Sequence, residues 1–306
     1  MMDILQSARD RIYNRGLKIV MPEGHDPRVC SAAEQLREEK LAEPILITRE
    51  VAPPTPQEIS YIQNRRERMA LNMASRLLAK PFFRAGVMVA TGTADAMLAG
   101  ATSATGRVIE AGLMAIGLAP GIKTPSSFYL MQWPNTRIIF ADCAVNIQPT
   151  ADQLADIALS AAESARILLD VEPRVAMLSF STKGSGQHAD ARKVAEALKI
   201  AKARDPCLKI DGELQSDTAI SEGIAVRKLK DVGDVAGRAN VLIFPDLDAA
   251  NISYKLLQHL GGAQAIGPIL QGFARPISDI SRGATVADIV ATATLLLSTA
   301  AQSERR

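Results

Sequence analysis

The stretch RVAMLSFSTKGSGQHADARKVAEALKIA (residues 174–201) decides the fold class. Residues 174–180 form an apolar run of strand length, which is followed by a turn rich in glycine and serine and then by an amphipathic helical pattern. A buried strand that passes through a short turn into a helix is typical of a mostly parallel sheet covered by helices on both faces. This stretch therefore predicts an α/β fold.

The same alternation recurs along the 306-residue chain. Helical patterns such as 28–40 and 151–169 separate short apolar runs, and Thr150 with Gln153 predicts a capping box at the start of the second helix. The predicted strands lie at residues 17–21, 44–48, 86–90, 126–131, 137–140, 174–180 and 240–244.

A polar stretch that contains a proline, NIQPT (146–150), predicts a boundary between two domains. The closing helix, at about 285–301, is apolar but too short and too interrupted to span a membrane, so we expect it to be buried against the first domain. The expected domains are therefore a discontinuous first domain, 1–148 plus 278–306, and a second domain, 149–277.

The composition excludes several classes of function. Lys and Arg total 35 against 33 Asp and Glu, and aromatic residues make up only 4%, which argues against a nucleic-acid-binding surface. No run reaches the ~18 apolar residues of a membrane span, and no signal-peptide core precedes the first helix. Cys30, Cys143 and Cys207 are far apart and the histidines lack metal-ligand spacing, so we expect no disulfide framework, no metal site and a cytoplasmic location.

The first candidate site is the turn Ser181–Gly186. Its glycines allow a ligand to approach the backbone, its hydroxyls can donate, and the helix that follows offers free N–H groups to an anion. A plain strand-to-helix turn with serine caps explains the pattern equally well. The turn lacks the spacing of a P-loop or of GxGxxG, so nucleotide hydrolysis and an NAD site have no support.

The second candidate site is ISDISRGATVADIV (277–290), where Ser281 and Arg282 precede the final helix. Thr285 and Asp288 have the spacing of a capping box, which is the simpler interpretation. The functional interpretation uses the same geometry, because a hydroxyl, a guanidinium and a carboxylate at one helix N-terminus can hold a phosphate and accept a proton.

Arginines are the remaining candidates. Arg65, Arg66 and Arg68 cluster in NRRERM, and Arg107 follows a small-residue stretch. An isolated surface arginine is usually only solvated, although its forked guanidinium suits phosphate. Cys143 follows an apolar strand with no histidine nearby, which predicts a buried thiol rather than a nucleophile.

Several stretches resemble the phosphate acetyltransferase (phosphotransacetylase) family, within the phosphate acetyl/butyryltransferase superfamily. They are MPEGHDPRV (21–29), FADCAVNIQPTADQLADIA (140–158), LSFSTKGSGQHADARKV (178–194) and NVLIFPDLDAANISYKLLQHLGGAQAIGPILQGFARPISDISRG (240–283). The resemblance implies two αβα three-layer domains with a cleft between them, an isocitrate dehydrogenase-like architecture that usually forms a homodimer. The implied activity is reversible acetyl transfer between acetyl phosphate and coenzyme A.

The resemblance also implies roles for the second candidate site. The family's catalytic Ser-Arg pair, and an Asp seven residues after the Ser, fall on Ser281, Arg282 and Asp288 with the spacing intact. Asp288 would take the thiol proton, Ser281 would hold the oxyanion or the thiol, and Arg282 would neutralise phosphate. The substrate-binding residues would include Gly283 and, from the first candidate site, Thr182, Lys183, Gly184 and Ser185.

The family's two phosphate-binding arginines match this chain less well. One matches Arg65, with a gap that leaves Arg66 or Arg68 open, and the other aligns with Glu110. We predict that Arg107, about one turn earlier if the segment is helical, replaces the second arginine.

The expected substrates are acetyl phosphate, phosphate and coenzyme A, with no metal or other cofactor, no nucleic acid and no membrane as a partner. Two alternatives stay open: a butyryl- or propionyl-specific phosphate acyltransferase, and a non-catalytic acyl-coenzyme A sensor like the C-terminal domain of some malic enzymes.

Overall fold

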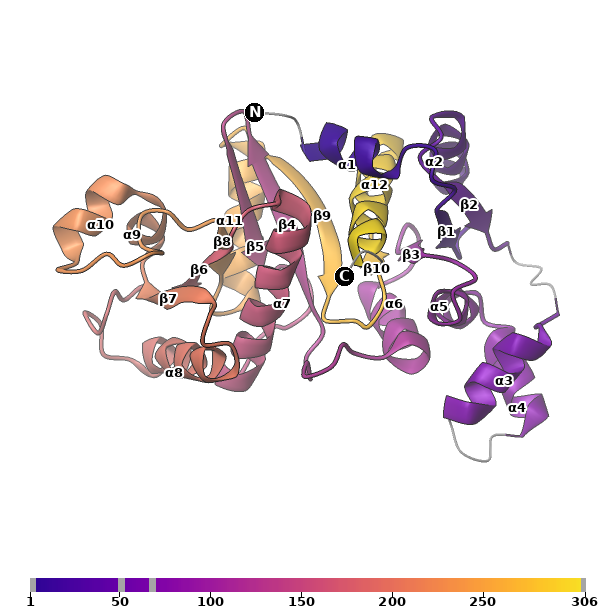
Figure 1. Cartoon of the computed structure of the whole chain (residues 1–306), viewed down its shortest axis with the longest axis horizontal. Helices are drawn as coiled ribbons and strands as arrows, with labels where there is room; N and C mark the ends of the chain where they lie inside the picture. The colour runs from indigo at the N-terminus through magenta and orange to yellow at the C-terminus, as the bar shows by residue number, and fades with distance from the viewer. Residues whose placement is uncertain (1–3, 49–52, 66–69, 304–306) are drawn as a thin grey trace. The chain divides into compact units, whose positions relative to one another are not determined.

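The computed structural model describes residues 4–48, 53–65 and 70–303. The described residues form an α/β fold, as the sequence predicts (Figure 1). The chain divides into two compact units, one made of Met1–Pro120 with Phe273–Arg306 and the other of Gly121–Gly272.

The first unit is built on a parallel sheet in the order β2-β1-β3-β10. Helices α1, α2 and α12 pack together on the sheet, while α5 and α6 pack against other parts of it (Figure 1). The strands are β1 (Lys18–Met21), β2 (Glu43–Leu46), β3 (Ala96–Ala99) and β10 (Ile277–Asp279). The helices are α1 (Ile4–Ile12), α2 (Pro27–Glu38), α3 (Pro56–Arg65), α4 (Leu71–Leu78), α5 (Pro81–Ala90), α6 (Thr105–Ala111), the π-helix η1 (Gly112–Ile116) and α12 (Val286–Ser303).

The second unit is built on a mixed sheet in the order β9-β4-β5-β8-β6-β7, in which β4 runs antiparallel to both of its neighbours. Helices α7 and α8 pack against each other and against the sheet, and Tyr254 of α11 stacks on Tyr129 of β4 at 4.1 Å. The strands are β4 (Ser126–Trp133), β5 (Thr136–Ala141), β6 (Arg174–Leu178), β7 (Lys209–Leu214), β8 (Val241–Ile243) and β9 (Gln264–Gln271). The helices are α7 (Ala151–Leu169), α8 (Ala189–Arg204), α9 (Ser216–Ile220), α10 (Glu222–Lys228) and α11 (Leu247–His259).

Most predicted elements occur, and the capping box of Thr150 and Gln153 at the start of α7 is confirmed. The predicted strand at 86–90 is wrong, because these residues end helix α5. Pro81 starts that helix, and most of the 86–90 side chains are buried. A short apolar run that is buried on every side cannot be assigned to strand or helix by periodicity.

The contact-based units have different bounds from the predicted domains. The predicted boundary at 148/149 would separate β4 and β5 from the strands that pair with them, β9 and β8. Those pairings place both strands in the second unit, whose bounds are therefore 121–272.

Helix α12 is largely buried in the first unit, where it contacts α1, α2, β3 and β10. The buried Thr294 is satisfied within the helix, because its hydroxyl donates to the Val290 carbonyl at 2.7 Å. Among the described helices, none combines the length and the apolar character that crossing a bilayer requires.

Candidate active site

The segment between β10 and α12 carries three of the predicted site residues, Ser281, Arg282 and Asp288, and all three are exposed. The Ser281 hydroxyl oxygen accepts a hydrogen bond from the Gly283 N–H at 3.2 Å, which closes a tight turn. The hydroxyl hydrogen of Ser281 therefore stays available to a ligand.

Thr285 and Asp288 form the predicted capping box. Asp288 Oδ2 accepts from the Thr285 N–H at 2.9 Å and from its hydroxyl at 2.7 Å, and the Asp288 N–H returns a bond to Thr285 Oγ at 3.2 Å. Asp288 Oδ1 has no partner among the described residues. Capping thus uses one carboxylate oxygen and leaves the other able to accept a proton.

Arg28 fixes the backbone of this segment. Its Nη1 donates to the carbonyls of Arg282 and Ala284 at 2.8 and 2.9 Å, and its Nη2 donates to the carbonyl of Ala101 at 2.9 Å. The same guanidinium pairs with Asp26 at 2.8 Å and lowers the pKa of that carboxyl, chiefly through the side-chain hydrogen bond. One arginine therefore joins the β3–α6 turn to the segment that carries Ser281.

A second set of hydrogen bonds connects the β1–α2 turn to the residues that follow β3. The buried carboxylate of Glu23 accepts bonds from the N–H groups of Gly100, Ala101 and Thr102 at 2.7 to 2.9 Å, and from the Thr102 hydroxyl at 2.7 Å. Neither Glu23 nor Arg28 was predicted as a site residue from the sequence. The available signal was the position of Glu23 just beyond a buried parallel strand, where polar groups of α/β folds commonly gather.

Asp279, at the end of β10, is a second acidic residue near the site that was not predicted from the sequence. Its side chain is buried, with Oδ2 accepting from the Thr105 hydroxyl at 2.5 Å. Burial and, to a lesser extent, the nearby charge of Glu23 raise the pKa of Asp279 to about 6, against the opposing Thr105 hydrogen bond and Arg282 charge.

Arg107 and Glu110 both lie on helix α6, three positions apart and therefore on one face. Both line a cavity of about 500 Å³ in the first unit. The other lining residues are Leu77, Ala79, Lys80, Pro81, Phe82, Phe83, Ala111 and Met114. Arg107 thus lines the same cavity as Glu110, the position with which the family arginine aligns.

Arg65 ends helix α3, and its contacts lie elsewhere in the first unit. Its Nη1 donates to the Tyr61 hydroxyl at 3.2 Å, and its Nη2 would lie 2.3 Å from a Cβ built at Gly117. The guanidinium therefore packs over the end of the π-helix η1. Arg66 and Arg68, the alternatives to Arg65, lie outside the described residues.

In the turn Ser181–Gly186 of the second unit, the backbone N–H groups are already hydrogen-bonded to other groups of the protein. The Gly184 N–H donates to the buried carboxylate of Glu213 at 2.6 Å, and the Thr182 and Gly186 N–H groups donate to hydroxyls of the turn at 2.9 Å. Helix α8 begins only at Ala189. Its N-terminus is capped by His188, beside the carboxylate of Asp190. The backbone therefore follows the plain strand-to-helix turn, and the expected set of free N–H groups for an anion is absent from this turn.

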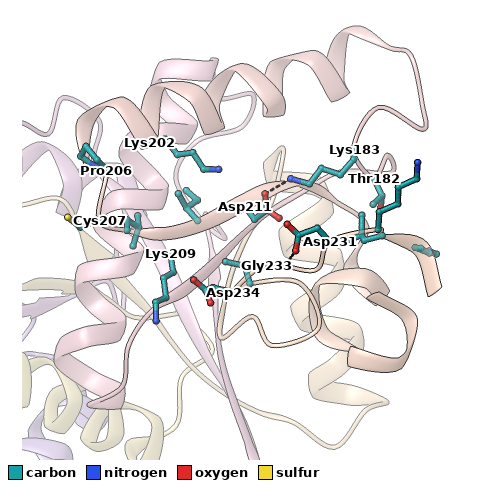
Figure 2. A pocket seen from close by; sticks show the side chains of 16 residues that line it. Thr182, Lys183, Lys202, Pro206, Cys207, Lys209, Asp211, Asp231, Gly233 and Asp234 are labelled. Carbon is teal, nitrogen blue, oxygen red and sulfur yellow. Dashed lines mark hydrogen bonds and ion pairs between the residues drawn. The ribbon is translucent and has the colours of Figure 1, made fainter. Parts of the chain in front are cut away.

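Lys183 is turned away from the backbone of this turn. Its ammonium pairs with the Asp211 carboxylate and donates to the Gly212 carbonyl at 3.1 Å (Figure 2). Asp211 lies in a groove of about 1080 Å³ that runs along strand β7. Four more lysines line this groove: Lys202, Lys209, Lys228 and Lys230.

Cys143 is fully buried, and this burial raises the pKa of its thiol well above the usual range. A buried, protonated thiol is inert, as expected for a packing residue. Among the residues that the structure describes, no group of three or more His, Cys, Asp or Glu side chains could hold a metal ion.

Comparisons with known proteins connect this geometry to a family. The family model described as "Phosphate acetyl/butaryl transferase" matches residues 1–297. The phosphate acetyltransferase of Clostridium acetobutylicum is 40% identical over 94% of this chain and 96% of its own length. That of Bacillus subtilis is 36% identical over 99% of this chain and all of its own. The crystal structure of a phosphotransacetylase from Streptococcus pyogenes superposes with a TM-score of 0.88 at 38% identity, covering 99% of this chain and 98% of that one.

The role of Glu213 in the turn can be tested directly. Replacing Glu213 with Ala removes the acceptor of the Gly184 N–H and of the Ser181 hydroxyl. A donor left without its partner costs about 1–3 kcal/mol, so we expect amide hydrogen exchange across residues 181–186 to accelerate about fivefold or more. Glu213→Gln, which keeps an acceptor oxygen, is the matched control. Equal exchange in Glu213→Ala and the parent protein would contradict this account.

Proposed function

The chain belongs to the phosphate acetyl/butaryl transferase family, and from this premise we propose that it transfers an acetyl group between acetyl phosphate and coenzyme A by direct thiolate attack in a ternary complex. The reaction is reversible, so acetyl-coenzyme A and phosphate give coenzyme A and acetyl phosphate. One observation carries the assignment of residues: Ser281, Arg282 and Asp288 lie together on one exposed segment whose backbone is fixed by Arg28.

Asp288 is the proposed general base. A thiol with a pKa near ~8.5 is only a few per cent thiolate at neutral pH, so attack needs a proton acceptor. Asp288 lies at the N-terminus of α12, and its Oδ1, which has no partner among the described residues, can take the proton. As the proton moves from sulfur to Oδ1, the sulfur electron pair forms a bond to the acetyl carbon. The bond from that carbon to the phosphate oxygen breaks, and phosphate leaves with the electron pair.

Ser281 and the arginines stabilise the charge that develops. The Ser281 hydroxyl donates to the carbonyl oxygen as it becomes an oxyanion, an interaction worth about 2.7–4 kcal/mol in other acyl transfers. Arg282, Arg65 and Arg107 neutralise acetyl phosphate and the departing phosphate. Acetyl phosphate already contains a good leaving group, so the proposed mechanism uses no metal or prosthetic group.

The remaining proposed contacts involve the turns. Gly283 keeps the Ser281 turn tight through its N–H. Because the N–H groups of the turn Ser181–Gly186 are largely occupied, we propose that its contacts with coenzyme A or phosphate run through exposed atoms of Lys183, Gly184 and Ser185, with Thr182 shaping the turn through Gln215.

The assembly and location of the protein are separate proposals. By its resemblance to the family, the chain would act as a homodimer in the cytoplasm, on small-molecule substrates and without nucleic acid or membrane partners. Sedimentation of the purified protein tests the dimer independently of any activity.

A direct assay tests the reaction. Purified protein mixed with acetyl phosphate and coenzyme A should give a rise in thioester absorbance that depends on both substrates. Propionyl phosphate and butyryl phosphate, assayed in parallel, report the acyl preference, and a higher kcat/KM for either would favour the alternative acyltransferase. Binding of acetyl-coenzyme A without turnover at high protein concentration would refute the catalytic assignment and support the sensor alternative.

Asp288→Asn should lower kcat far more than it raises KM, because a positioned general base contributes about 10²- to 10⁴-fold. Thr285→Ala is the control for capping, since it removes the cap hydroxyl but keeps the carboxylate. That control should lose roughly 1 kcal/mol of stability and retain most of kcat. If kcat of Asp288→Asn equals that of the parent protein, Asp288 is only a capping residue.

Arg107→Gln should raise the KM for acetyl phosphate by about tenfold or more, because hydrogen bonds to charged groups contribute roughly 1.5–3 kcal/mol. Glu110→Gln, on the same wall of the cavity, is the matched control and should not raise this KM. An unaffected KM in Arg107→Gln would show that Arg107 does not replace the family arginine.

A further inference from the structure

Asp279 connects two segments of the first unit, strand β10 and the start of helix α6. It is the last residue of β10, opposite Ala99 of β3, and the N–H that follows it, on Ile280, donates to the Ala99 carbonyl at 2.8 Å. Its side chain is only 3% exposed. Because Ser281 and Arg282 follow within three residues, the strand that holds Asp279 also sets where they start.

The carboxyl group reaches the other segment through Thr105. The Thr105 hydroxyl donates to Asp279 Oδ2 at 2.5 Å, across 174 positions in the sequence. Thr105 is the first residue of α6, and Arg107 lies in the same turn. One side chain therefore connects the strand that leads to Arg282 with the helix that carries Arg107.

The second oxygen of this carboxyl group is buried without a partner. Asp279 Oδ1 has no hydrogen bond among the described residues. A Cβ built at Gly100, where φ is +106°, would lie 2.0 Å from this oxygen, so only glycine leaves room for it. A buried, unsatisfied polar atom is costly, and proteins retain few of them. Packing alone does not explain why this position carries a carboxylate.

The charges around Asp279 come from each element packed against it. Glu23 faces it from the β1–α2 turn and disfavours its charge, whereas Arg282 favours its charge and Thr105 of α6 stabilises the charged form by hydrogen bonding. On the first turn of α12 the titratable side chain is Asp288, which is bonded to Thr285. Burial is the largest effect and raises the pKa of Asp279 to about 6, inside the range that activity measurements reach.

We propose that Asp279 is a positioning residue for acetyl transfer, whose negative charge attracts the guanidinium of Arg282, three residues along the chain, and whose hydrogen bond to Thr105 fixes the start of α6, so that protonation of Asp279 weakens phosphate binding. The inference rests on the proposed roles of Arg282 and Arg107. Asp279 touches no substrate in this scheme. It acts through the arginines that do.

The sign of the pH effect follows from the direction of the pKa change. Above about pH 6 Asp279 is charged and attracts Arg282, whereas below that value the carboxyl group becomes neutral and this attraction is lost. Affinity for acetyl phosphate should therefore fall as the pH drops through about 6. Direct repulsion between Asp279 and phosphate would have the opposite sign, so the two effects are distinguishable.

The experiment compares the parent protein with Asp279→Asn between pH 5 and 8. The amide keeps an acceptor for Thr105 but has no charge, so KM for acetyl phosphate at pH 7.5 should rise about fivefold, the upper range for attraction to an exposed charge, with a smaller change in kcat. The ratio of the two KM values should approach one by pH 5. Both proteins act on the same substrate ionisation states, so this ratio isolates Asp279. A constant ratio, or parent affinity that rises toward acid pH relative to the variant, would overturn the proposal.

Thr105→Val provides a second, independent readout. It removes the hydrogen bond that favours the charged form but leaves the carboxyl group in place, so the inflection in KM should move to higher pH. An unmoved inflection would contradict the proposed connection.

Inorganic phosphate binding, measured by calorimetry at the same pH values, separates this proposal from the proposed reaction. A parent protein without turnover would refute the reaction. The phosphate affinities of the parent protein and of Asp279→Asn would still decide whether Asp279 acts on binding.

Discussion

The buried carboxylate of Glu23 is the constraint on which the candidate site depends. Three successive N–H groups, from Gly100 to Thr102, point at its two oxygens, and the Thr102 hydroxyl adds a fourth donor. Such a set of charge-assisted bonds offsets the cost of removing a carboxylate from water. It also fixes the direction in which the chain leaves β3, and this direction brings the start of α6 to the side chain of Asp279.

Arg28 and Asp288 also order this segment, and each does so through atoms that leave the proposed reactive groups unoccupied. Within the described part of the chain, the Arg28 side chain binds backbone carbonyls and Asp26, so it sets the path of the segment that carries Ser281 without occupying its functional groups. The two carboxylate oxygens of Asp288 differ in role: Oδ2 caps the helix, and Oδ1 has no partner among the described residues. A segment can therefore be both well ordered and chemically available, because different atoms serve the two purposes.

The sequence was most informative where the decisive contacts are local. The capping boxes of α7 and α12 join residues three positions apart, and both were predictable from residue type and spacing. The apolar runs predicted most strands, but not the identity of 86–90, because a fully buried helix and a fully buried strand have the same composition. The domain bounds depended on which strands pair with β4 and β5, which spacing does not reveal.

In the candidate site, too, local contacts were predictable from the sequence and long-range contacts were not. Ser281, Arg282 and Asp288 were predictable as one linear segment, whereas Glu23 contacts residues 77 to 79 positions away and Thr105 contacts a residue 174 positions away. Nor could the sequence show that the Gly184 N–H of the turn Ser181–Gly186 donates to Glu213, a side chain on another strand.

Strand β7, which carries Glu213, ends the strand order of its sheet. Lys209 projects from it, Lys202 and Lys230 line the groove beside it, and Lys183 covers the Gly212 carbonyl. An open strand edge is a template for pairing with other chains, and lysines beside it oppose that pairing by repulsion and by the cost of desolvating their charges. We therefore expect the groove to oppose edge-to-edge pairing, and neutralising these ammonium groups to weaken that opposition.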